Sequence, residues 1–156
     1  MAPFAGLAEA LDNNLRPLCM LKVDDILAQG LAHRAAALLI SDREGRRILR
    51  ASASGEWGFT AAAPVAAGMA LDDCRILLAE SWPSRLYDWR SPAVIQPCEE
   101  TGRAQVHIFE AKCARVPAGD DLLPLARGEY DALLARGYPV SPLLKLAVDS
   151  GAARWP

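Results

Sequence analysis

The sequence lacks an apolar stretch of the roughly 18 residues that a transmembrane helix requires, so no membrane span is predicted. It also lacks an excess of positive charge. Its 17 basic and 19 acidic residues give a formal net charge of −2, which leaves no basis for nonspecific binding to nucleic acid. The stretch 1–16 contains Glu9 and Asp12 without an early positive charge, unlike a secretory signal peptide. We therefore expect a cytoplasmic protein that has neither a membrane nor a nucleic acid as its partner.

The four cysteines lie far apart in the sequence. No two of Cys19, Cys74, Cys98 and Cys113 form a Cys-x-x-Cys pair, and only two histidines are available to join them. A zinc ribbon or a thiol redox motif is therefore not predicted. The sequence also has no Gly-x-Ser-x-Gly motif, so it does not predict an acyl-transfer triad. We expect reduced, buried thiols of the kind common in cytoplasmic proteins.

What the chain does have is a large apolar fraction. Of its 156 residues, 52% are hydrophobic and 23% are charged, which suits a single domain over 1–156. Leu71, Cys74 and Leu78 recur at helical spacing within 69–82, and apolar residues alternate along 103–114 as in a strand. Two apolar runs, 35–42 and 46–51, flank a glycine-containing turn and predict a hairpin. Further helices are predicted over 7–15, 23–29, 127–136 and 141–149, a loop with a brief strand over 52–65, and an irregular stretch over 83–102. This order predicts an α/β sandwich with a mixed sheet.

Several short sequence words occur in an order that resembles one known family. They are Gly30–Ala35 before an apolar strand, Asp42–Arg46 in the hairpin turn, Trp57 before a small-residue strand, Val65–Gly68, and Val140–Leu144. Together they resemble the Nudix superfamily, in its MutT-like and isopentenyl-diphosphate-isomerase-like branch. The resemblance covers residues 28–150 and leaves 1–27 as an N-terminal extension. It implies a Nudix-type α/β/α sandwich with a mixed β-sheet and flanking helices.

The signature box of that family does not match. The motif runs Gly, five residues, Glu, seven residues, Arg-Glu, an aliphatic residue, any residue, Glu-Glu, any residue, Gly. With Gly68 taken as the glycine before the first box glutamate, that glutamate falls on Met69. The later box glutamates fall on Leu78, Ser81 and Trp82. In the family these glutamates lie on one helix face and hold the divalent cations of diphosphate hydrolysis. A hydroxyl and two apolar side chains offer Mg²⁺ or Mn²⁺ no such set of oxygen ligands.

Three hypotheses follow. The first is a Nudix-fold protein that has lost the metal-binding box, needs no cofactor, and serves as a non-hydrolytic ligand-binding or regulatory module. The second is an active diphosphate hydrolase with relocated carboxylates, Glu80 with Glu99 or Glu100, which would need Mg²⁺ or Mn²⁺. The third is a small structural or interaction subunit. A solvated role is the simpler interpretation of all three glutamates.

The resemblance implies a small phosphorylated or nucleotide-like ligand, and it leaves a homodimer open. Arginines 43, 46, 47 and 50 gather around the hairpin turn, where a solvated edge is the favoured interpretation. Arg50 lies one residue from the place where family members grip a diphosphate. The tryptophans and a tyrosine can floor a pocket for a flat ligand, and His107 can point into a cleft. The candidate ligand-binding residues are Arg50, Trp57, Trp82, Tyr87, Trp89 and His107.

Overall fold

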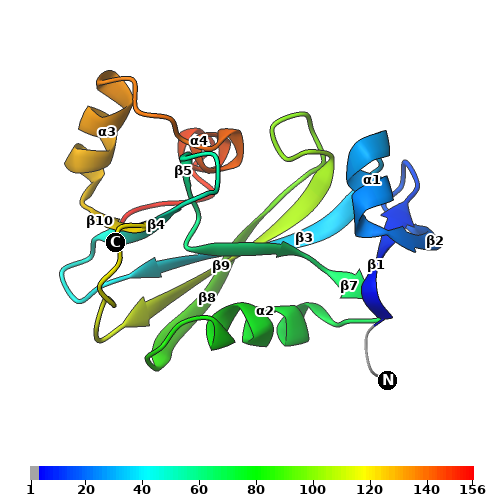
Figure 1. Cartoon of the computed structure of the whole chain (residues 1–156), viewed down its shortest axis with the longest axis horizontal. Helices are drawn as coiled ribbons and strands as arrows, with labels where there is room; N and C mark the ends of the chain where they lie inside the picture. The colour runs from blue at the N-terminus through cyan, green and yellow to red at the C-terminus, as the bar shows by residue number, and fades with distance from the viewer. Residues whose placement is uncertain (1–3) are drawn as a thin grey trace.

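The computed structural model describes residues 4–156, so residues 1–3 of the predicted N-terminal extension lie outside it. A seven-stranded sheet forms the centre of the molecule (Figure 1). β3 and β9 pair in parallel, whereas the other neighbours in this sheet are antiparallel. This confirms the mixed sheet. Its strands are β10 (Leu122–Leu125), β4 (Arg47–Ala51), β3 (His33–Ser41), β9 (Ala104–Cys113) and β8 (Leu86–Ile95), in that order. β5 (Trp57–Gly58) pairs with β4, and β6 (Ala61–Pro64) pairs with β3.

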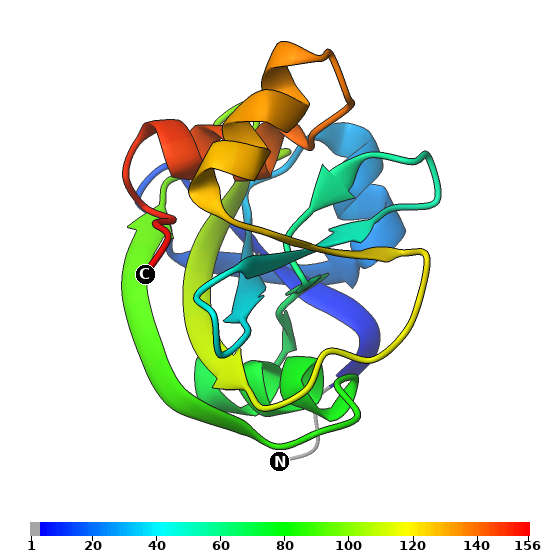
Figure 2. The same cartoon turned by 90° about the vertical axis from the view of Figure 1, so that its left-hand side faces the viewer.

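Helices cover both faces of this sheet (Figures 1 and 2). α2 (Leu71–Glu80) lies on one face, and α3 (Arg127–Ala135) and α4 (Pro142–Asp149) lie on the other. β9 contacts the helices on both faces of the sheet, because successive side chains of a strand point to opposite faces. Its residues Val106 and Ile108 pack under α4, whereas Phe109 and Ala111 pack under α2. The predicted α/β/α sandwich is therefore confirmed. None of the helices within residues 4–156 is long and apolar enough to cross a membrane.

A second, three-stranded sheet lies at the N-terminal side. It contains β2 (Pro17–Lys22), β1 (Phe4–Leu11) and β7 (Ala66–Ala67), and α1 (Val23–Gln29) follows β2. The helix predicted over 7–15 is wrong, because most of that segment is strand β1. Ala8 and Ala10 are buried while Leu7 and Glu9 are half-exposed, which is the two-residue period of a strand. Pairing with β2 and β7 decides between the two structures, since so short an apolar run is ambiguous in sequence.

The irregular stretch predicted over 83–102 is also wrong for its central part, which forms the ten-residue strand β8. β8 pairs with β9, but the register shifts on both sides of Arg90. Each shift inserts an extra residue into β8, as in a β-bulge. Asp88 accordingly has a positive φ of 52°. The bulges break the alternation of apolar and polar residues, which is why the sequence does not look like a strand.

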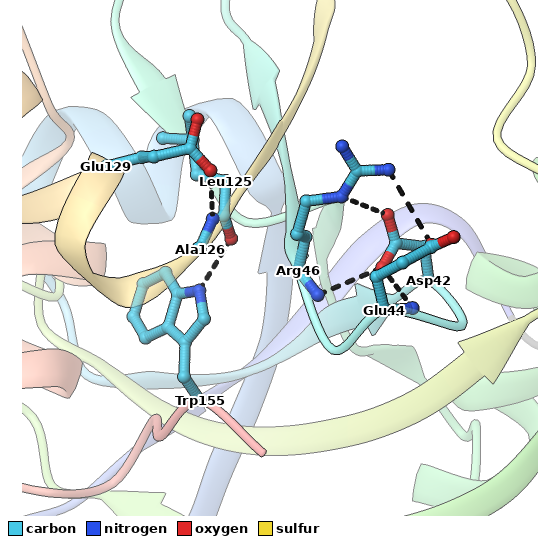
Figure 3. A network of polar contacts seen from close by, with 7 residues as sticks. All are labelled: Asp42, Glu44, Arg46, Leu125, Ala126, Glu129 and Trp155. Atoms are coloured by element: carbon cyan, nitrogen blue, oxygen red, sulfur yellow. Dashed lines mark hydrogen bonds and ion pairs between the residues drawn. The ribbon is translucent and has the colours of Figure 1, made fainter.

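Polar contacts hold the hairpin turn and the C-terminal tail, residues 151–156, in place (Figure 3). In the predicted β3–β4 hairpin, the buried Asp42 carboxylate accepts the amides of Glu44 and Arg46 and pairs with the Arg46 Nε at 2.7 Å. The Trp155 Nε1 donates to the carbonyl of Leu125 at 2.7 Å. This hydrogen bond fixes the tail to β10, the edge strand of the sheet.

Candidate functional site

The inner face of α2 is apolar. Gly68, with a φ of 78°, turns the chain before the helix, and Asp72 and Asp73 favour its first turn by interaction with the helix dipole. Cys74 and Leu78 on this face, and Trp82 just beyond the end of α2, follow one another at four-residue spacing and are 2%, 7% and 5% exposed. They belong to one apolar cluster with residues of β3, β4 and β9. The predicted placement of Leu78 in the core is therefore confirmed.

The inner face of α2 lacks the chemistry to hold the divalent cation that the Nudix resemblance implies. Mg²⁺ and Mn²⁺ take oxygen ligands in preference to others. Cys74, Leu78 and Trp82 present a thiol, an alkyl group and an indole, and the Ser81 hydroxyl donates to the Leu78 carbonyl at 2.7 Å. These residues do not fit the cation. Within the described chain, no three residues among His, Cys, Asp and Glu are arranged to hold a metal ion.

The carboxylates of the second hypothesis lie far apart. Glu80 is exposed at the end of α2, close to Leu86 at the start of β8. Glu99 and Glu100 are exposed in the turn that follows β8. The ten-residue strand between them spans about 30 Å at roughly 3.3 Å per residue. Hydrogen bonds from the backbone and from Cys98 lower the pKa of the Glu100 carboxyl, which favours a charged carboxylate over a general acid.

Trp89 and Glu80 border a groove of about 330 Å³ between α2 and β8. The guanidinium of Arg75 lies 4.6 Å from the centroid of the Trp89 ring, and its Nε lies 3.5 Å from an Asp72 oxygen. Trp89 packs at the border of the apolar cluster that contains Trp82. The groove therefore offers one aromatic face, and a guanidinium already covers it.

Arg50 and Trp57 lie on the paired strands β4 and β5, but Arg50 is opposite Gly58 and Trp57 is opposite Ala51. Successive side chains of a strand point to opposite faces, so Arg50 and Trp57 do not share a face of the sheet. The Arg50 Nε donates to the Thr60 carbonyl at 2.8 Å, and its Nη1 pairs with Asp121 at 2.7 Å. Trp57 packs against the cluster under α4. A pocket of about 330 Å³ lies beside Arg50 and Ser141. The Arg50 guanidinium is thus largely engaged by protein groups.

His107 and Tyr87 are separate from these sites. His107 is half-buried, and its Nε2 has no hydrogen-bond partner among residues 4–156. Desolvation by burial lowers the pKa of His107, and the positive charge of Arg34 lowers it further, so the imidazole is neutral at pH 7. Arg34 itself pairs with Glu9 at 3.1 Å. Tyr87 lies near the 42–45 turn. The six predicted ligand-binding residues therefore do not form one site.

The sequence did not indicate one charged cavity that the structure contains. It has a volume of about 510 Å³ and is bordered by Arg47, Arg90, Glu110 and Lys112 from the sheet and by the C-terminal tail. We call it the basic pocket. The solvated-edge interpretation of the arginine group is wrong for Arg47, which is 4% exposed. One signal was available: on the α4-facing side of β9, the apolar residues 104–108 give way to charged ones.

Comparison with protein-family models finds no match to this sequence, and comparison with curated protein sequences finds no significant match. Solved structures do match. The crystal structure of DR0079 from Deinococcus radiodurans covers 92% of this chain and 98% of its own, at 15% sequence identity and a TM-score of 0.74. The solution structure of DR0079, described as a hypothetical Nudix protein, covers 88% of this chain and 89% of its own, at 14% identity and a TM-score of 0.54. The chain has the Nudix fold.

A NUDIX hydrolase from Nitrosomonas europaea has the same fold at 13% identity and a TM-score of 0.52, over 80% of this chain and 93% of its own. The Nudix fold confirms the element order expected from the resemblance: the hairpin β3–β4, the glycine-led helix α2, the strand β9 and the helix α4. With the anchor on Gly68, α2 corresponds to the helix that carries the glutamates of the Nudix box.

Proposed function

We propose that this Nudix-fold chain has lost the metal-binding box and acts as a non-hydrolytic module that binds a small phosphorylated or nucleotide-like ligand. The observation that carries the proposal is the packing of Cys74, Leu78 and Trp82 against the sheet. The proposal includes a cytoplasmic location, which the four free cysteines favour.

The physical reason for the loss of metal binding is that the inner face of α2 is apolar and buried, whereas the helix of the Nudix box is acidic and hydrated. Metal-dependent hydrolysis needs cations at the diphosphate, both as Lewis acids and to orient the attacking water. On the anchor above, Leu78 and Trp82 stand at positions where the Nudix box has glutamates, and both side chains are buried. Desolvating a cation without compensating ligands is strongly unfavourable. Replacing the box glutamates by apolar residues therefore removes the metal ligands and adds apolar contacts to the core.

The test is a titration with MgCl₂ or MnCl₂, monitored by the melting temperature Tm and by turnover of a nucleoside diphosphate derivative. We expect no metal-dependent turnover and no rise in Tm at millimolar metal. Glu80→Gln should leave any residual hydrolysis unchanged, as should Asp73→Asn, a matched change on the same helix. Metal-dependent turnover that drops about 100-fold in Glu80→Gln but not in Asp73→Asn would support the active hydrolase instead.

A further inference from the structure

The C-terminal tail follows helix α4 (Figure 2), and several residues of this tail border the basic pocket. Under α4 the sheet presents apolar side chains, including Val106 and Ile108. Beyond α4 the same side of β9 presents Glu110 and Lys112. The tail therefore covers a charged surface instead of an apolar one. This arrangement leaves a cavity within the size range of small-molecule sites, roughly 300–1,000 Å³.

Arg47 forms the floor of the basic pocket and is held rigidly. Its Nη2 lies 2.8 Å from a carboxylate oxygen of Glu110, and its Nε and Nη2 donate to the carbonyl of Arg154 in the tail at 2.9 and 2.6 Å. The side chains of Arg47 and Glu110 are 5% and 13% exposed. The positive charge of Arg47 and the negative charge of Glu110 therefore cancel at the floor of the pocket.

Additional positive charge comes from the rim of the basic pocket. Arg90 is exposed and stands opposite Glu110 across the β8–β9 pair, and the two bulges of β8 flank it. Among the described residues, Arg90 makes no ion pair, and its charge disfavours that of Arg47. Bulges commonly re-aim a side chain next to a functional site. Arg90 thus adds a second guanidinium near the Arg47–Glu110 ion pair.

The charge balance of the rim defines the ligand class. Lys112 lies 3.6 Å from Asp88, at the longer limit of an ion pair, and the Arg154 side chain donates to the backbone carbonyl of Gly151 at 3.1 Å. The four basic and two acidic side chains that border the pocket leave an excess of two positive charges. A phosphate monoester carries about −1.5 to −2 at pH 7, and the guanidinium fork matches its oxygens. A ligand with one carboxylate carries a single negative charge and would neutralise only half of this excess.

We propose that the basic pocket binds a small molecule through a phosphate or diphosphate group, contacted by Arg90, Lys112 and Arg154. This inference rests on the proposed function, because it names the site at which the non-hydrolytic module takes its ligand. The cavity of about 510 Å³ has room for an organic group besides the phosphate. Arg47 orients the tail and Glu110 from beneath.

The probe is sodium pyrophosphate, titrated at constant ionic strength in EDTA and followed by calorimetry and by Tm. We expect saturable binding to the wild-type chain and an increase in Tm. Arg90→Gln and Lys112→Gln should each weaken binding about 10-fold, as expected for the loss of one charge-assisted contact. Arg85→Gln is the matched control, because Arg85 is exposed just before β8 but borders the α2–β8 groove instead.

Two outcomes would overturn the inference. The first is no saturable binding of pyrophosphate to the wild-type chain up to millimolar concentrations. The second is an equal loss in Arg85→Gln and Arg90→Gln, which would indicate general attraction by surface charge. Since EDTA removes divalent metal, binding here is independent of hydrolysis. Turnover with Mg²⁺ would therefore refute the proposed function while leaving the pocket intact, and absent binding without turnover would refute the pocket alone.

Discussion

Two adjacent leucines of α2 provide a sharp test of the orientation of this helix. Leu78 is 7% exposed and belongs to the apolar cluster beneath α2, whereas Leu77 is 51% exposed. We expect Leu78→Ala to lower the free energy of unfolding much more than Leu77→Ala. Ala and Leu differ little in helix propensity, and that difference is the same at both positions. The comparison therefore isolates burial.

The magnitude follows from the atoms removed. Leu78→Ala deletes three carbon groups from the core, worth about 2.4 kcal/mol at roughly 0.8 kcal/mol each. The cavity that remains adds to this, so we expect a loss of about 3 kcal/mol within the usual range of about 2–5 kcal/mol. In a chain of 156 residues this lowers Tm by about 6–12 °C. Leu77→Ala should cost less than about 1 kcal/mol.

Urea unfolding followed by tryptophan fluorescence measures both variants. The denaturation midpoint should shift for Leu78→Ala at an unchanged m-value, because an altered m-value would indicate a changed denatured state. Equal losses, or a larger loss in Leu77→Ala, would mean that α2 is rotated about its axis. In that case Leu78 does not face the sheet, and the proposed function loses its main support.

Three further predictions concern groups elsewhere in the fold. Arg47→Ala should lower the free energy of unfolding by about 3–5 kcal/mol, because it leaves the Glu110 carboxylate buried without its partner; a loss below about 1 kcal/mol in urea unfolding would contradict the ion pair. The lowered pKa of His107 means that the unfolded chain takes up its proton first, so stability should fall as pH drops through about 6.5. His107→Gln should reduce this loss of stability between pH 7.5 and 5.5. An unchanged dependence of the free energy of unfolding on pH would show that His107 is not its source. Cys19 is exposed and should react with a thiol reagent in the native protein, whereas burial raises the pKa of Cys113 and should delay its reaction until unfolding; simultaneous labelling would argue against that burial.

Local patterns predicted much of the fold. The β3–β4 hairpin, the helices α1, α2, α3 and α4 and the strand β9 all lie where periodicity and turn residues indicated. In each of these elements, the signal and the structure involve the same few neighbouring residues. The predictions for the segments that form strands β1 and β8 were wrong for the opposite reason. Their identity depends on pairing partners distant in the chain, and two bulges additionally interrupt β8.

The candidate ligand-binding residues likewise depend on contacts between segments that are distant in the chain. Arg50 and Trp57 lie on paired strands but out of register with each other, and Trp82, a candidate ligand-binding residue, is buried in the core. A tryptophan looks identical in sequence whether it lines a pocket or fills a core, since its indole suits both. How α2 and the turn after it pack against the sheet decides between the two environments.

By itself, the sequence determined the order of most elements, the absence of glutamates at the expected box positions after Gly68, and the near balance of charge. Each of these can be seen within a short window of the chain. Tertiary structure alone decided that Arg47 is buried and that Arg90, Lys112 and the C-terminal tail border one pocket. Burial and electrostatic environment depend on which distant segments pack together, and sheet pairing brings those segments within reach of one another.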